Sequence, residues 1–181
     1  MAHMPWTRLQ KALADRLAPS MRAHIAIHQA RYRNTGEEAG RVWLTLDGRE
    51  LISFDTSRYV ARRAQIVNEM RAGVGPFGLS ATSDYGEFLD KDRAAVEWLR
   101  RAGEYDDYCA IADLEAYLSM SIDEALASPA PLLRALAMAD RRLGKRRLKS
   151  LSLPSTEHPT VRHMLHARCQ AEGIDRSTGA V

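Results

Sequence analysis

The dipeptide Asp47-Gly48, set between two stretches of alternating apolar and polar residues, is the strongest structural signal in this chain. Asp-Gly favours the two-residue turn of a β-hairpin, because both turn positions adopt positive φ angles. The alternation covers residues 41–46 before the turn and 50–54 after it, as half-buried strands require. A third alternating stretch begins at His24. The sequence therefore predicts a three-stranded antiparallel meander.

Only one face of this sheet needs to be buried. The alternation assigns these side chains to the buried face: Ile25, Ile27, Val42, Leu44, Leu46, Ile52 and Phe54. The next apolar residues recur at helical spacing over 57–72, after a group of capping residues at 55–57 and before Gly73. We expect this helix to cover the buried face. A turn-rich segment, 34–40, connects the first two strands.

Helical patterns dominate the rest of the chain. Pro5 begins an amphipathic helix that Pro19 ends. The glycine-rich residues 73–86 have the composition of a linker. Beyond it, helices are predicted at 88–101, 109–118, 122–127, 131–143, 146–151 and 160–172. The fold class is therefore α+β, with a three-stranded antiparallel sheet backed by a helix and a helical C-terminal half.

The chain has 181 residues, which suffices for one well-buried core or for two small subdomains that share an interface. We interpret 5–73 as the first unit, 74–86 as the linker, and 87–174 as a helical half packed on the first unit. The opening Met-Ala-His-Met is typical of a vector-derived extension and is left out of this division.

Six basic side chains surround Gly144 and form the densest positive charge in the chain. They are Arg141, Arg142, Lys145, Arg146, Arg147 and Lys149. The net charge is only +3 and the pI is near 9.0, so a basic surface must come from clustering. Cations held together by a folded segment sum their fields and can bind phosphates or another acidic surface. Acidic residues gather between 84 and 124, so internal pairing with this acidic middle is the alternative.

Two smaller groups add to the candidate site. Arg58, Arg62 and Arg63 lie on the solvent side of the predicted 57–72 helix, and Arg41 with Trp43 lies on the outer sheet face. Basic residues beside an aromatic ring can enter a groove or stack on bases. The alternatives are a solvated charged face with local ion pairs for the helix, and burial of Trp43 under the helical half.

No pattern in the sequence indicates catalysis or metal binding. His163, His166 and Cys169 recur every third residue, but the third side chain would lie about 120° around the helix axis from the first. The sequence has no nucleophile elbow, and Pro76 removes an amide donor that a phosphate-binding loop at 73–78 would need. We therefore expect no metal site and no cofactor, and the sequence favours a protein without enzymatic activity.

Cysteine usage and hydropathy indicate the cellular compartment in which we expect the protein. Cys109 and Cys169 match no metal-ligand spacing, and reduced thiols in the cytoplasm are the expected state. The longest apolar runs fall well short of the roughly 20 residues that cross a membrane, so we expect no membrane partner.

Four segments are similar to a family of bacterial conserved hypothetical proteins: 42–50, 121–126, 133–148 and 157–173. The resemblance spans Trp6 to Gly173, and it implies a bacterial cytosolic protein without assigning catalytic residues. A second, local resemblance covers 41–44, 53–56 and the helix that follows. These residues resemble the strand and helix arrangement of AP2-type DNA-binding domains, although the base-reading residues of that family have no clear counterpart here.

These observations lead to a functional hypothesis. We expect a non-enzymatic protein that engages nucleic acid through 141–149, assisted by the arginines at 58–63. The alternative is an interaction module or small homodimer whose basic segment meets an acidic protein surface. The sequence does not indicate the oligomeric state.

Overall fold

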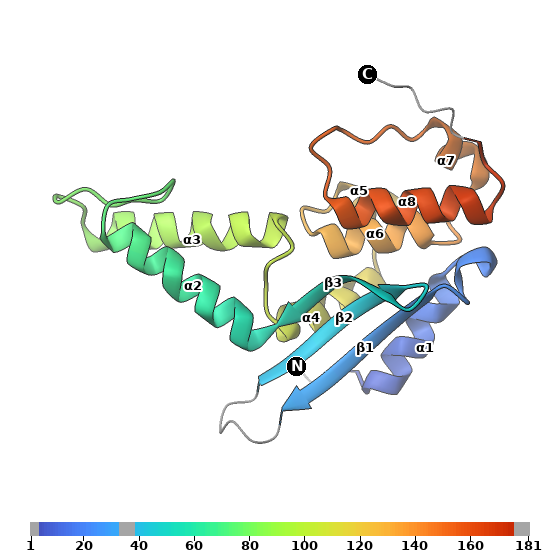
Figure 1. The fold of residues 1–181 in the computed structure, drawn as a ribbon, viewed down its shortest axis with the longest axis horizontal. Helices are drawn as coiled ribbons and strands as arrows, with labels where there is room; N and C mark the ends of the chain where they lie inside the picture. Colours follow the sequence, from blue (N-terminus) through green and yellow to red (C-terminus); the bar gives the residue numbers. More distant parts are fainter. Residues whose placement is uncertain (1–3, 33–38, 176–181) are drawn as a thin grey trace.

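The computed structural model describes residues 4–32 and 39–175 and contains the predicted meander (Figure 1). The strands are β1 (Ile25–Tyr32), β2 (Ala39–Leu46) and β3 (Arg49–Asp55), antiparallel in the order β1-β2-β3. The helices are α1 (Trp6–Arg16), the short 3-10 helix η1 (Pro19–Met21), α2 (Thr56–Arg71), α3 (Tyr85–Arg101), α4 (Asp107–Tyr117), α5 (Ile122–Ala127), α6 (Pro131–Ala139), α7 (Lys145–Ser150) and α8 (Pro159–Ala171). The α+β prediction is confirmed. Most of the predicted turn at 34–40, and residues 1–3, lie outside the described residues.

The β2–β3 hairpin turns at Asp47 and Gly48, whose φ angles are 51° and 75°. Both values fall in the left-handed region, as the turn predicted from Asp-Gly requires. The cross-strand register places Val42 opposite Phe54 and Leu44 opposite Ile52. All four of these side chains are buried, as predicted, whereas Leu46 and Ile27, which were also predicted to be buried, are half-buried.

The buried face of the sheet belongs to a large core that also includes α1, α4, α6 and α8. The helix predicted to cover this face, α2, contacts β2 and β3, but its two buried residues, Ile66 and Met70, belong to a second core. Helix α4 contacts the same two strands and contributes buried residues to the large core. In Figure 1, α1 and α4 lie behind the sheet, while α2 and α3 extend away from it to one side. The large core therefore draws on elements from both ends of the chain.

Helices α2 and α3 pack together around a small core of their own. Its buried members are Ile66, Met70, Ala95 and Leu99. Gly73 follows α2 with a φ of 71°, and its amide donates to the carbonyl oxygen of Met70 at 3.1 Å. The predicted linker, 74–86, joins these two helices. The large core contains residues from both sides of this linker. The division of the chain into two units at the linker stays a prediction.

A buried carboxylate joins the starts of three elements. Asp107, at the start of α4, accepts a hydrogen bond from the hydroxyl of Thr56 at the start of α2. Gly40 lies against this carboxylate in β2, where a Cβ would come within 2.2 Å of the Asp107 Oδ2 atom. Because glycine has no side chain, the Asp107 carboxylate can lie directly against the β2 backbone at this position. The carboxylate thereby connects the starts of α2 and α4 to β2.

Candidate nucleic-acid interface

The basic cluster follows the most buried helix of the fold. Every residue of α6 except Arg134 is buried, and Asp140, which directly follows the helix, is fully buried. The chain then turns and begins α7 at Lys145. Leu143 and Leu148 are also fully buried, so they fix the turn and α7 against the large core. The charged residues between these two leucines face outward because their neighbours are anchored.

Arg142 is the exception, because its guanidinium group is used inside the protein. Its Nη2 atom lies 2.8 Å from Oδ2 of Asp140, and its Nη1 atom donates to the carbonyl oxygen of Met120 at 2.6 Å. The guanidinium carbon also lies 5.6 Å from the centre of the Tyr117 ring. The prediction that Arg142 belongs to an exposed cluster is therefore corrected: it neutralises a buried carboxylate.

The other five cations are exposed. Lys145 pairs with Glu172 at 3.0 Å, and Arg147 pairs with Asp123 at the start of α5. The Lys145 and Arg147 side chains stay 64% and 44% exposed in these pairs, so each pair adds little stability. Within the described ranges, the remaining three have no ion-pair partner: Arg141, Arg146 and Lys149. We call the five exposed residues the α7 basic face: Arg141, Lys145, Arg146, Arg147 and Lys149.

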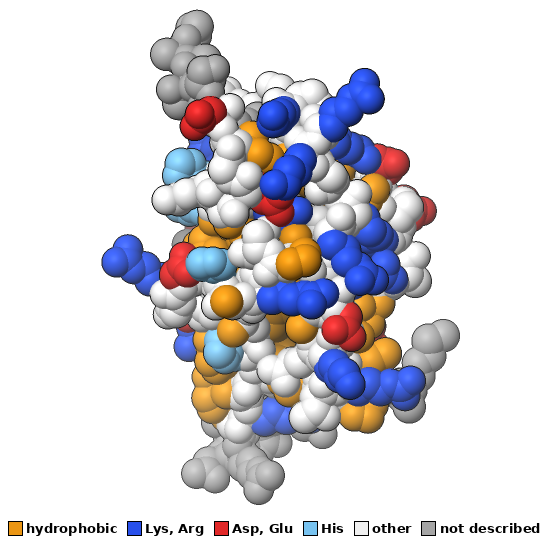
Figure 2. Space-filling view, turned by 90° about the vertical axis from the view of Figure 1, so that its right-hand side faces the viewer, with side chains coloured by type: hydrophobic (Ala, Val, Ile, Leu, Met, Phe, Trp, Pro, Cys, Tyr) orange, Lys and Arg blue, Asp and Glu red, His pale blue; other side chains and the backbone are white. Residues whose placement is uncertain are grey.

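The structure places the end of α1 beside this face, which the sequence did not predict. The amide of Arg141 donates to the carbonyl oxygen of Arg16 at 2.9 Å, and Leu17 forms an isolated bridge with Asp140. Arg22, a few residues further on, is exposed. Figure 2 looks onto this side of the molecule, where Lys and Arg side chains outnumber the acidic ones. Arg16 and Arg141 are far apart in the sequence, so the sequence does not indicate that they are close in space.

The sheet residues predicted to join the site are engaged with their neighbours. Arg41 forms an ion pair with Glu50, and its Nε atom donates to Oγ of Ser53 at 2.8 Å. Its guanidinium carbon lies 4.9 Å from the centre of the Trp43 ring, and His28 stacks on the same ring at 5.0 Å. Trp43 is half-buried, so it is neither an open stacking platform nor a core residue.

The three predicted arginines of α2 lie far from α7, on the opposite side of the molecule in Figure 1. Arg63 pairs with Asp92 of α3 at 2.8 Å. Arg62 lies 3.4 Å from Glu104 and 5.8 Å from the centre of an exposed tryptophan ring on α3. Arg58 has no ion-pair partner among the residues described. The eleven predicted residues therefore do not form one surface.

The residues weighed for metal binding and catalysis do not converge. His163 and His166 are exposed on α8, whereas Cys169 is buried. In the described part of the chain, no group of three or more His, Cys, Asp or Glu side chains could hold a metal ion. Burial, followed by the charge of Asp106, raises the pKa of the Cys109 thiol to about 11, which keeps it protonated at neutral pH.

Fold and site together define an α+β protein that presents a short basic helix anchored on a buried one. The chain belongs to the SF0329 protein family, whose family model matches residues 5–169. Neither a curated protein nor a solved structure matches the chain. None of the helices in the described ranges combines the length and the apolar character that a membrane crossing requires.

Proposed function

We propose that the protein binds nucleic acid through the α7 basic face, without sequence preference. The observation that carries this proposal is that Arg141, Arg146 and Lys149 are exposed and have no ion-pair partner among the described residues. Their backbone is held by the buried Leu143 and Leu148, so the charges stay close together at little further cost in backbone entropy. Phosphates that bind there release condensed counterions, which favours association.

The composition of the face supports contacts to phosphates more than contacts to bases. Helix α7 has six residues, and its exposed ones are Lys, Arg and a single Ser. Such side chains bind phosphate oxygens wherever the backbone passes, and these contacts carry no sequence information. We expect dissociation constants on the order of 10⁻⁴ to 10⁻⁶ M at physiological salt, as is typical of non-specific binding.

The alternative is an interaction module that meets an acidic protein surface. The pair between Arg147 and Asp123 favours it, because one cation of the face already meets an acidic residue. Asp123 belongs to the acidic middle of the chain, but six of the twelve carboxylates between 84 and 124 are paired with other cations, which leaves fewer of them for the α7 basic face. These pairs are Glu87–Lys91, Asp90–Arg93, Asp92–Arg63, Glu97–Arg101, Glu104–Arg62 and Asp113–Arg100.

The proposal leaves out the predicted residues on the sheet and on α2. A role for the sheet, suggested by the local similarity to AP2-type domains, has less support because Arg41 and Trp43 already contact each other and their neighbours. The arginines at 58–63 lie on α2, which Figure 1 places on the other side of the molecule from α7.

Fluorescence anisotropy with labelled duplex DNA and RNA tests the proposal. The affinity of the wild-type protein should fall steeply with salt, with a log-log slope of about 0.9 for each phosphate contacted. Arg146→Glu combined with Lys149→Glu should abolish binding. The control combines Arg71→Glu with Arg93→Glu, which changes the net charge equally at exposed positions on α2 and α3, across the molecule from α7 in Figure 1. Equal losses in both double variants would show a non-local charge effect and reject the α7 basic face as the site.

Size-exclusion chromatography across the same salt range tests the alternative. Absence of nucleic-acid binding, together with self-association that the α7 double variant removes, would favour the interaction module. A monomer that binds duplex at low salt would favour the nucleic-acid proposal.

A further inference from the structure

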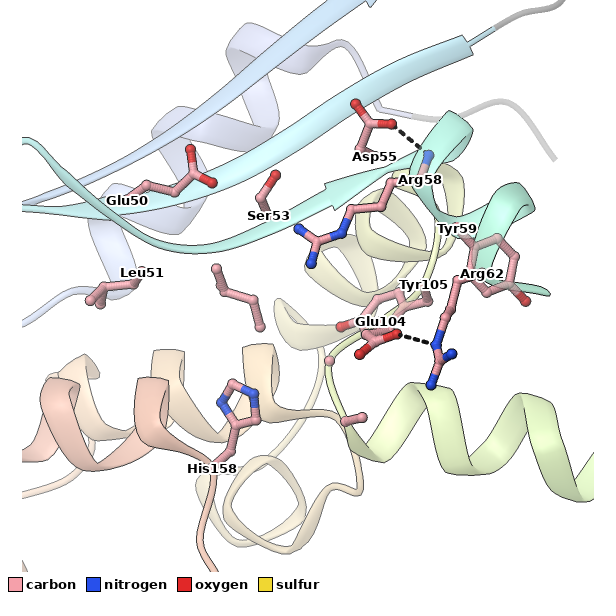
Figure 3. Close-up of a pocket in the computed structure, with 13 residues that line it drawn as sticks. Glu50, Leu51, Ser53, Asp55, Arg58, Tyr59, Arg62, Glu104, Tyr105 and His158 are labelled. Atoms are coloured by element: carbon pink, nitrogen blue, oxygen red, sulfur yellow. Dashed lines mark hydrogen bonds and ion pairs between the residues drawn. The ribbon is translucent and has the colours of Figure 1, made fainter. Parts of the chain in front are cut away.

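A pocket of about 310 Å³ lies beside β3, on the side of the sheet where no further strand pairs with it (Figure 3). Its walls come from three distant parts of the chain: the segment from Glu50 to Arg62, the loop 102–105 between α3 and α4, and His158 at the start of α8. A hydrogen bond from the hydroxyl of Thr160 to the carbonyl oxygen of Leu51 ties α8 to β3 next to it. The pocket is therefore built by the tertiary fold.

The charged groups around the pocket leave one cation without a counterion. Glu50 is paired with Arg41, and Glu104 lies 3.4 Å from Arg62. Asp55 caps α2 by accepting from the backbone amide of Arg58 at 2.9 Å. In Figure 3, the Asp55 carboxylate points away from the pocket, whereas the Arg58 guanidinium extends into it. Arg58 has no ion-pair partner among the described residues, so its guanidinium group is free to bind a ligand in the pocket.

A neutral donor and a neutral ring also line the pocket. Oγ of Ser53 accepts from Arg41, so its own hydrogen is free to be donated. Nδ1 of His158 accepts from the amide of Thr160 at 3.2 Å. Burial lowers the pKa of His158, so at neutral pH the ring is neutral and carries its hydrogen on Nε2, where the backbone of Ala102 accepts it. The His158 ring therefore forms a neutral wall of the pocket.

We propose that this pocket binds a small organic anion, with its carboxylate or phosphate group held by Arg58 and its apolar body against Ile52 and Tyr105. The planar guanidinium group matches either oxyanion with two parallel hydrogen bonds. The hydroxyl of Ser53 supplies a further donor near Arg58. Ile52 and Tyr105 are 8% and 5% exposed, and they give the pocket an apolar wall. The volume is at the lower end of the range for ligand pockets, which restricts the ligand to a small molecule.

The site is independent of the α7 basic face. Arg58 lies on α2, which Figure 1 places on the opposite side of the molecule from α7. Loss of anion binding should therefore leave nucleic-acid binding unchanged, and the two proposals can fail separately.

Isothermal titration calorimetry with benzoate, phenyl phosphate and inorganic phosphate tests the proposal and separates the two kinds of head group. We expect benzoate or phenyl phosphate to bind more tightly than inorganic phosphate, because only the first two fill the apolar part. Arg58→Ala should weaken that binding by about tenfold or more, as loss of hydrogen bonds to a charged group does. Arg58→Lys should bind with intermediate affinity, because lysine keeps the positive charge but lacks the planar guanidinium group that forms two parallel hydrogen bonds.

Arg71→Ala is the matched control, because Arg71 is an exposed arginine at the other end of α2. It should bind like the wild-type protein. Amide chemical shifts in a two-dimensional NMR titration should move at Ser53, Gly103 and His158. Binding that Arg58→Ala leaves unchanged would overturn the proposal, as would the failure of all three probes to bind the wild-type protein. Thermal unfolding of each variant establishes that it is folded.

Discussion

The hydroxyl of Tyr117 donates to Oδ2 of Asp140 across 2.5 Å, and Arg142 binds the same carboxylate from the other side of a tight turn. Burial by itself would raise the pKa of Asp140, but the hydrogen bonds from Arg142 and Tyr117 together outweigh it, and the pKa is lowered. The unfolded chain therefore takes up this proton more readily than the folded protein. The network stabilises the fold above the unfolded pKa, and its contribution is lost as pH falls through the lower, folded pKa.

Asp140→Asn should remove this pH-dependent stabilisation. We expect a loss of about 3 kcal/mol near neutral pH, because Arg142 is left facing a buried group without charge. The free energy of unfolding should also depend less on pH below about pH 4 than in the wild-type protein. Urea titrations across the acid range measure both quantities. Tyr117→Phe, which keeps the ring and loses one hydrogen bond, should cost only about 1 kcal/mol. Identical pH profiles for the wild type and Asp140→Asn would contradict the assignment.

Arg142 and Arg146 should behave oppositely although both lie in one basic run. Arg142→Ala leaves the carboxylate of Asp140 buried with only Tyr117 as a side-chain partner, and should destabilise by about 3 kcal/mol. Arg146→Ala removes an exposed, unpaired side chain and should change stability by no more than about 0.5 kcal/mol. Thermal unfolding of the two variants measures the difference. A similar stability for both would mean that the Asp140 network contributes little.

Leu44→Ala should cost about 2 to 5 kcal/mol, because Leu44 is fully packed between the sheet and the large core and its truncation leaves a cavity. Leu46, two residues along the same strand, is only half-buried, and its truncation should cost clearly less. Equilibrium unfolding in urea compares the two. A cost below about 0.5 kcal/mol for Leu44→Ala would show that this face of the sheet is not the packed one.

Gly40→Ala should destabilise the protein by about 1 to 3 kcal/mol, because the added methyl group overlaps the Asp107 carboxylate and the backbone there cannot easily move. Asp107→Ala should relieve part of this cost when the two changes are combined, which a double-mutant cycle measures. Gly144→Ala is the control, because a Cβ there meets nothing within 4 Å. Strict additivity of the changes at 40 and 107 would argue against their contact.

The parts of the fold that the sequence predicted are those set by neighbouring residues. Asp47-Gly48 and the alternation around it fixed the hairpin, because turn geometry and side-chain period act within a few residues. The basic run around Gly144 could also be predicted, because its residues are neighbours in the sequence. Its exposure depended on Leu143 and Leu148, whose apolar side chains are visible in the sequence at helical spacing.

The sequence did not predict features that depend on distant contacts. Asp140 is next to the basic run, but its burial follows from α6, and its second partner, Tyr117, comes from α4. The pocket beside β3 was missed for the same reason, because its walls come from three separate segments. Arg58 was predicted as a functional residue for a surface on α7, whereas the structure directs its side chain into that pocket.

The bridge between Leu17 and Asp140 bears on how the protein is made. The segment after α1 pairs with residues that a ribosome synthesises only after the sheet and five further helices. The N-terminal helix can pack behind the sheet and against α4 early, but the segment that follows it has no partner until residues 139–141 are made. Completion of the fold is therefore a late event, in which the first segment of the chain closes against one of the last.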